Sequence, residues 1–167
     1  MLNRTKVENP KELFVHKLGA ALTMENTVEE MLGNLITKAV DNQLKQQLRH
    51  HREETQAQIR NLRQAFSTLG MEAKERPCPA IDGIEHEVDS NLGMADESLH
   101  DAIILAGAAE TEHHEIVVYE SLIVHANALG HDDLVSLLQE NLEQEQHTLG
   151  EVLKATVKLA KREHARA

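Results

Sequence analysis

Residues 104–122 read ILAGAAETEHHEIVVYESL and carry the pattern that decides the fold. Apolar and small residues recur here at helical spacing, but the carboxylates of Glu112 and Glu115 interrupt them. The complete stripe is Ile104, Ala108, Glu112, Glu115, Tyr119 and Leu122. This pattern predicts a long helix with two acidic side chains on the face that should be buried.

Three other stretches show the same combination of an apolar stripe and a polar interruption. They are Leu18, Leu22, Glu25, Val28 and Leu32; Leu44, Leu48, His51, Glu54, Gln58 and Leu62; and Leu138, Leu142, Glu145 and Leu149. Each spacing fits one face of an α-helix. The chain is therefore predicted to form four long helices that bury polar groups at a similar place along their length.

Capping residues mark where these helices begin and end. Asn9 followed by Pro10 predicts the first start, and Asp41 predicts a tight turn before the second helix. Gly70 and Gly130 are placed as C-terminal glycines of the second and third long helices. The remaining starts are assigned to Asp96 or Ser98 for the third long helix and to Asp132 or Asp133 for the fourth.

The connections predict the topology. Met71 to Ala80 holds two of the three prolines and is expected to be irregular, with a short amphipathic helix near Ile81 to Val88. A short, a long and a short connection are typical of a ferritin-like bundle with one crossover. We therefore predict an all-α fold: one domain over residues 1–167, an antiparallel four-helix bundle of two hairpins, with a frayed tail from about Lys161.

Composition limits the function classes. Of 167 residues, 41% are apolar, and the only aromatic residues are Phe14, Phe66 and Tyr119, which favours helix packing over a sandwich or barrel. The net charge of −11 and the absence of a basic stripe argue against nucleic-acid and anionic-membrane partners. No apolar run has the length of a membrane span, and the single Cys78 fits a reducing compartment, so a cytoplasmic protein is expected.

The interrupting carboxylates fall at matched depths. Glu25 and Glu54 are equidistant from the turn before Asp41, and Glu115 and Glu145 are equidistant from Gly130. Unpaired charges in an apolar core are strongly destabilising, and no Lys or Arg lies on these stripes at the same depth. Protonation or bound cations must compensate, and two metal ions would balance roughly four to six negative charges.

Individual side chains have alternative roles. His51 and Glu54 share a helix face at a spacing that suits a metal-ligand pair. Gln58 is either a weak ligand or a donor to a ligand, and Tyr119 either hydrogen-bonds a ligating carboxylate or is a plain core tyrosine. The predicted ligand set is Glu25, His51, Glu54, Glu112, Glu115 and Glu145.

At these residues the chain resembles the ferritin-like, stress-associated bacterial proteins of the YciE and YciF family. The similar motifs are Met24-Glu25; His51, Glu54, Thr55 and Gln58; Cys78 to Gly83; Glu112, His113, Glu115, Ile116 and Tyr119; Ala128 to Gly130; and Leu142 with Glu145. The resemblance covers nearly the whole chain. It implies a ferritin-like bundle, a di-metal site, homodimers and a link to stress responses.

The chain departs from typical ferritins because it lacks paired Glu-x-x-His motifs: His51 precedes Glu54, and Thr148 follows Glu145 where a histidine would stand. Two hypotheses follow. In the first, two iron or manganese ions react with O2 or peroxide, as in a di-iron oxidoreductase. In the second, the metal only stabilises the bundle of a non-catalytic stress protein.

Overall fold

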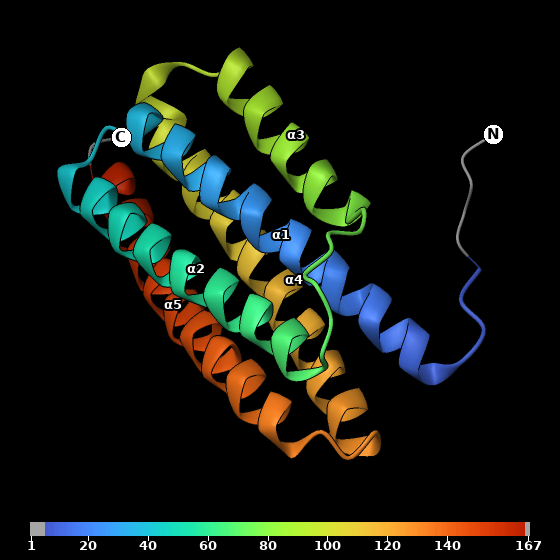
Figure 1. Cartoon of the computed structure of the whole chain (residues 1–167). Helices are drawn as coiled ribbons and strands as arrows, with labels where there is room; N and C mark the ends of the chain where they lie inside the picture. Colours follow the sequence, from blue (N-terminus) through green and yellow to red (C-terminus); the bar gives the residue numbers. More distant parts are fainter. Residues whose placement is uncertain (1–5, 166–167) are drawn as a thin grey trace.

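A computed structural model describes residues 6–165 of the chain. It is built of helices, and the predicted all-α bundle with one crossover is confirmed (Figure 1). The elements in chain order are α1 Pro10–Lys38, α2 Asn42–Thr68, α3 Pro79–Met94, the 3-10 turn η1 Glu97–Leu99, α4 His100–Ala128 and α5 Asp132–His164.

The four long helices pack in the order α1, α2, α5, α4, and α4 closes the ring against α1. Each of these neighbours is antiparallel to the next, as Figure 1 shows. Helix α3 lies outside the ring, against α1 and α4. Within residues 6–165, none of the helices combines the length and apolar character that crossing a bilayer requires.

The predicted caps position the helix ends. The side chain of Asn9 accepts a hydrogen bond from the Glu12 amide, and that of Asp41 accepts from the amide of Gln43. Gly70 and Gly130 have φ angles of 69° and 74°, the left-handed conformation that glycine adopts at a helix end. Asp96 caps η1 instead of α4 itself, because the 3-10 turn precedes the long helix.

Hydrogen bonds connect the two hairpins at the turn between α1 and α2. The carboxylate of Asp101, in the first turn of α4, accepts the amides of Val40 at 2.7 Å and Asp41 at 3.0 Å. The far end of α5 reaches the same place, where Arg162 lies 3.2 Å from the Asp41 carboxylate. Helix α5 continues to His164, beyond Lys161, where the sequence analysis places the start of the frayed tail.

The crossover differs from its prediction in one detail. Helix α3 extends from Pro79 to Met94 and is longer than the expected Ile81 to Val88, because proline is tolerated in the first turn of a helix. The irregular segment before α3 lies on α1, where the Arg76 amide donates to the Gly19 carbonyl at 3.0 Å. A Cβ at Gly19 would lie 2.5 Å from the Lys74 carbonyl oxygen, so this approach requires glycine.

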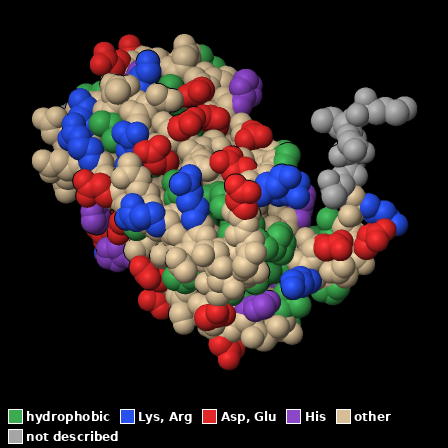
Figure 2. Space-filling view, in the orientation of Figure 1, with side chains coloured by type: hydrophobic (Ala, Val, Ile, Leu, Met, Phe, Trp, Pro, Cys, Tyr) green, Lys and Arg blue, Asp and Glu red, His purple; other side chains and the backbone are tan. Residues whose placement is uncertain are grey.

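The core has the composition that the sequence predicted. All three aromatic side chains, Phe14, Phe66 and Tyr119, are buried among leucine, isoleucine, valine, alanine and methionine. On the face drawn in Figure 2, Lys and Arg side chains are interspersed with Asp and Glu and form no continuous basic stripe. The polar residues of the four stripes lie inside this core and form the site described next.

Candidate metal centre

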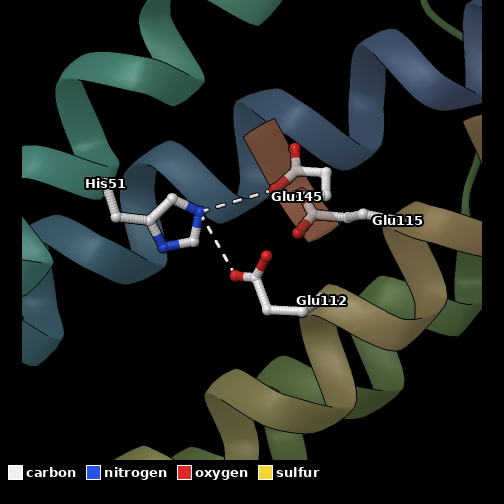
Figure 3. Close-up of side chains that lie close together, drawn as sticks. All are labelled: His51, Glu112, Glu115 and Glu145. Atoms are coloured by element: carbon white, nitrogen blue, oxygen red, sulfur yellow. Dashed lines mark ion pairs between the residues drawn. The ribbon is translucent and has the colours of Figure 1, made fainter. Parts of the chain in front are cut away.

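Four side chains from three helices meet in the middle of the bundle (Figure 3). His51 comes from α2, Glu112 and Glu115 from α4, and Glu145 from α5. Each offers one potential ligand atom, and these atoms all lie within 4.8 Å of one another. All four residues are buried, and we refer to them as the His51 cluster.

The side chains of the His51 cluster do not satisfy one another. His51 Nε2 lies 3.2 Å from Glu112 Oε1 and 3.8 Å from Glu145 Oε2. Neither contact is a hydrogen bond, and both oxygens of Glu112, Glu115 and Glu145 are also without a hydrogen-bond partner. Buried polar atoms in native proteins are almost always paired, so this concentration of unpaired atoms calls for a missing partner.

The electrostatics identify the charge of that partner. Burial, followed by the charge of Glu145, raises the pKa of Glu112 and of Glu115 well above the ordinary range. Burial raises the pKa of Glu145 to about 7. In the described part of the chain, the ion pairs that reach these carboxylates come only from His51. Without a cation the site therefore disfavours the charged form of these carboxyl groups, and a bound cation would stabilise the deprotonated form.

The imidazole is suited to ligation. Burial, with a smaller effect from the charge of His50, lowers the pKa of His51 to about 4. At neutral pH the ring is uncharged, and its Nε2 atom faces the carboxylates. One imidazole and three carboxylates are a donor set that suits iron or manganese. The residues present therefore fit a divalent or trivalent cation.

Glu25 lies beside the His51 cluster without belonging to it. Its side chain is fully buried on α1, where burial and then the charge of Glu145 raise its pKa well above the ordinary range. The Tyr119 hydroxyl donates a hydrogen bond to Glu25 Oε1, and Glu25 Oε2 has no partner. The hydrogen bond expected between Tyr119 and one of the inward carboxylates is therefore present.

The sequence analysis missed Asn141, which supports this contact from α5. Its amide nitrogen donates to the Tyr119 hydroxyl at 3.0 Å and to the Gln58 carbonyl at 3.3 Å, and its oxygen accepts from Asn61 at 2.8 Å. The sequence could have indicated an inward position for Asn141, because it precedes Glu145 by four residues and shares its helix face. Gln58 itself is fully buried, and both polar atoms of its side chain are unpaired.

Glu54, another member of the predicted ligand set, lies outside the His51 cluster. Its side chain is 20% exposed, and Oε1 lies 3.5 Å from His50 Nε2 at the edge of the bundle. A residue three positions after His51 is rotated by about 60° from it, whereas Thr55 is rotated by only about 40° to the other side. Thr55 is fully buried, so it takes the inner position that the sequence analysis gave to Glu54.

Comparison with known proteins gives a consistent picture. The model of the family described as a domain of unknown function, DUF892, matches residues 9–165. Protein YciF of Escherichia coli (strain K12) is 29% identical over 140 residues, which is 83% of this chain and 84% of that protein. The family match spans the bundle and includes His51, Glu112, Glu115 and Glu145.

Two solved structures share the fold. YcfI from Rhodopseudomonas palustris, for which a structural role has been suggested, has a TM-score of 0.86 and 37% identity, covering 91% of this chain and 97% of its own. The stress protein YciF of Escherichia coli has a TM-score of 0.88 and 25% identity in the structural alignment, covering 93% and 99%.

Proposed function

The chain belongs to the DUF892 family, and from this membership and the buried site we propose a ferritin-like metal-binding protein of the bacterial stress response. In this proposal the His51 cluster holds iron or manganese, and the bound metal reacts with O2 or peroxide. The single cysteine, Cys78, is free, in keeping with the expected cytoplasmic location.

One observation carries the proposal. Six carboxylate oxygens and one imidazole nitrogen of the His51 cluster are buried without a hydrogen-bond partner, and a cation would satisfy them together. The four side chains would hold one ion. Glu25 and Glu54 are the adjacent carboxylates available to a second ion, which would give the predicted pair of metals and the full set of six predicted ligands.

The surrounding residues would have distinct roles. Iron or manganese supplies one-electron chemistry toward oxidants when it is bound. The neutral His51 donates a nitrogen lone pair, and the Tyr119 hydroxyl holds Glu25 in one orientation. Glu112, Glu115 and Glu145 are buried away from bulk water and would bind the metal in their deprotonated form.

A second candidate is a non-catalytic protein in which the metal only stabilises the bundle. The complete burial of Glu112, Glu115 and Glu145 favours it, since a cation there would relieve repulsion even without turnover. The structural role suggested for YcfI of Rhodopseudomonas palustris points the same way. Metal-dependent stability without consumption of an oxidant would distinguish this candidate from the first.

The test begins with metal content. Protein purified without chelators, or titrated anaerobically with Fe(II) or Mn(II), should bind close to two ions per chain, on the usual di-metal pattern. Glu115→Gln should lose binding, whereas Glu120→Gln, an exposed position on the same helix, should retain it. A wild-type protein that binds neither metal would contradict the proposal. Peroxide consumption by the Fe(II) form then separates the two candidates.

The same proposal includes a homodimer. The outer face of α4 exposes Val117 and Val124, at 62% and 65%, and their spacing of seven residues places them on one side of the helix, where a second copy would pack. Val117→Glu combined with Val124→Glu should convert a dimer to a monomer in sedimentation equilibrium. A wild-type monomer would remove this part of the proposal.

A further inference from the structure

A pocket of about 180 Å³ lies between α2 and α5 and reaches His51. Its rim is polar, with Gln47, His50, Glu54, His147 and Glu151, and two buried polar side chains, His51 and Thr148, also line it. Its walls are apolar and come from three helices: Leu44, Leu48, Leu105, Ala108 and Val152. A hollow with apolar walls beside a buried polar cluster is the usual form of a small-molecule site.

His51 connects the pocket to the cluster. The same side chain lines the pocket and places its Nε2 atom 3.2 Å from Glu112. A second, smaller cavity of about 10 Å³ is lined in part by Ala108, His51 and Glu112. It lies on the side of His51 that faces the centre of the helix bundle. Apolar space therefore borders His51 on both sides, and a molecule in the pocket lies next to the His51 cluster.

The lining defines the chemistry of an occupant. A cavity of about 150 Å³ with apolar walls is large enough to hold benzene, so this pocket has room for a compact hydrocarbon group. Glu54 and Glu151 stand at the rim, and the carboxylates of the His51 cluster lie beyond it. Negative charge at this rim disfavours anions such as carboxylates. A neutral molecule with a compact apolar body and one small polar end fits best.

We propose that this pocket binds a small alkyl hydroperoxide, with its alkyl group against Leu44, Leu48 and Val152 and its peroxide end toward His51. The inference deepens the proposed function and rests on it for the reaction. Hydrogen peroxide has no apolar surface to bury against Leu44, Leu48 and Val152. An alkyl group buries apolar surface there and gains binding energy that hydrogen peroxide cannot.

The reaction balances with ferrous iron as the reductant. The O–O bond of the hydroperoxide breaks, two ferrous ions are oxidised to ferric ions, and the two electrons pass to the two oxygens. Two protons are taken up, so the products are one alcohol and one water. Ferrous iron is the metal already invoked by the proposed function, so no further reductant is required for a single turnover.

Binding is tested first on the metal-free protein, so that the readout does not depend on activity. The probe is tert-butyl alcohol, and NMR should show nuclear Overhauser effects between its methyl groups and those of Leu44, Leu48 and Val152. Val152→Phe should fill the pocket and abolish these signals. Val157→Phe, the same change at an exposed position of α5, should leave them intact. Absence of the signals in the wild-type protein overturns the inference without any variant.

Consumption of tert-butyl hydroperoxide by the Fe(II)-loaded protein is the second test. Val152→Phe should lower the rate by about tenfold at equal metal content, and Val157→Phe should not. A wild-type protein that binds iron and consumes hydrogen peroxide but not tert-butyl hydroperoxide overturns the inference and leaves the proposed function standing. A protein that binds neither iron nor manganese overturns the proposed function, and the methyl contacts then still decide whether the pocket binds an alkyl group.

Discussion

Replacing Glu145 by glutamine should remove part of the pH dependence of folding in the metal-free protein. Burial raises the pKa of Glu145 from its ordinary value of 4.5 to about 7, so the folded state favours the protonated side chain. The contribution of this side chain to stability is fully present below about pH 4.5 and is lost as the pH rises through about 7. The metal-free wild-type protein should therefore become less stable from acidic to mildly alkaline pH.

The size of the effect follows from the two pKa values. Each pKa unit corresponds to about 1.4 kcal/mol, so Glu145 alone accounts for about 3 kcal/mol of lost stability above neutral pH. Glu25, Glu112 and Glu115 shift in the same direction and add to it. Glu145→Gln should reduce the difference in unfolding free energy between about pH 5 and about pH 8 by about 3 kcal/mol.

Urea unfolding followed by far-ultraviolet circular dichroism, in the presence of a chelator, measures this difference. Glu143→Gln, at an exposed position of α5, is the matched control and should keep the wild-type pH dependence. Saturating Fe(II) or Mn(II) should restore stability to the wild type at the higher pH. If wild type and Glu145→Gln lose the same stability between the two pH values, folding does not raise the pKa of Glu145 and the reasoning fails.

Three further predictions concern the frame around the site, and urea unfolding tests each. Gly19→Ala should destabilise the fold by about 1–3 kcal/mol, because the added Cβ would meet the Lys74 carbonyl oxygen. Gly150→Ala, with open space around it, is the control and should stabilise the fold by about 1 kcal/mol. Equal effects of the two substitutions would refute the close contact between the crossover and α1. Tyr119→Phe should cost about 1–3 kcal/mol because Glu25 Oε1 loses its donor, and an unchanged midpoint would argue against that hydrogen bond. Asp101→Ala should lower the free energy of unfolding by about 1–3 kcal/mol, because the amides of Val40 and Asp41 lose their acceptor. Asp96→Ala, at an exposed cap, should lower it by less. The reverse order would contradict the buried role of Asp101.

The position of the site along the bundle was predictable from the sequence. Helix caps at Asn9 and Asp41 and the glycines at 70 and 130 define the lengths of the hairpins, and those lengths place the polar interruptions at one level. His51, Glu112, Glu115 and Glu145 follow from this alignment, because antiparallel neighbours bring residues equidistant from a turn to the same depth. These features depend on local backbone preferences and on helical periodicity, which a sequence carries directly.

The direction of individual side chains was less predictable. Glu54 and Thr55 are both close to the inward direction of α2, and the packing of α2 between α1 and α5 decides that Thr55 is inside. In the sequence, Asn141 is one polar residue among many. Only the structure shows that α4 places the Tyr119 hydroxyl 3.0 Å from the Asn141 amide nitrogen. A periodic pattern specifies a helix face only to within about one residue, or 100°, so the final rotation of each helix depends on its neighbours.

The sequence by itself determined four long helices, the crossover between hairpins and an acidic band at mid-height, because each depends on residues close together in the chain. Only the tertiary structure decided which carboxylates converge on His51, why Gly19 must lack a side chain, and that a pocket with apolar walls reaches the cluster between α2 and α5. These features arise where surfaces of different helices meet. Their geometry is set by packing between elements, which no single helix encodes.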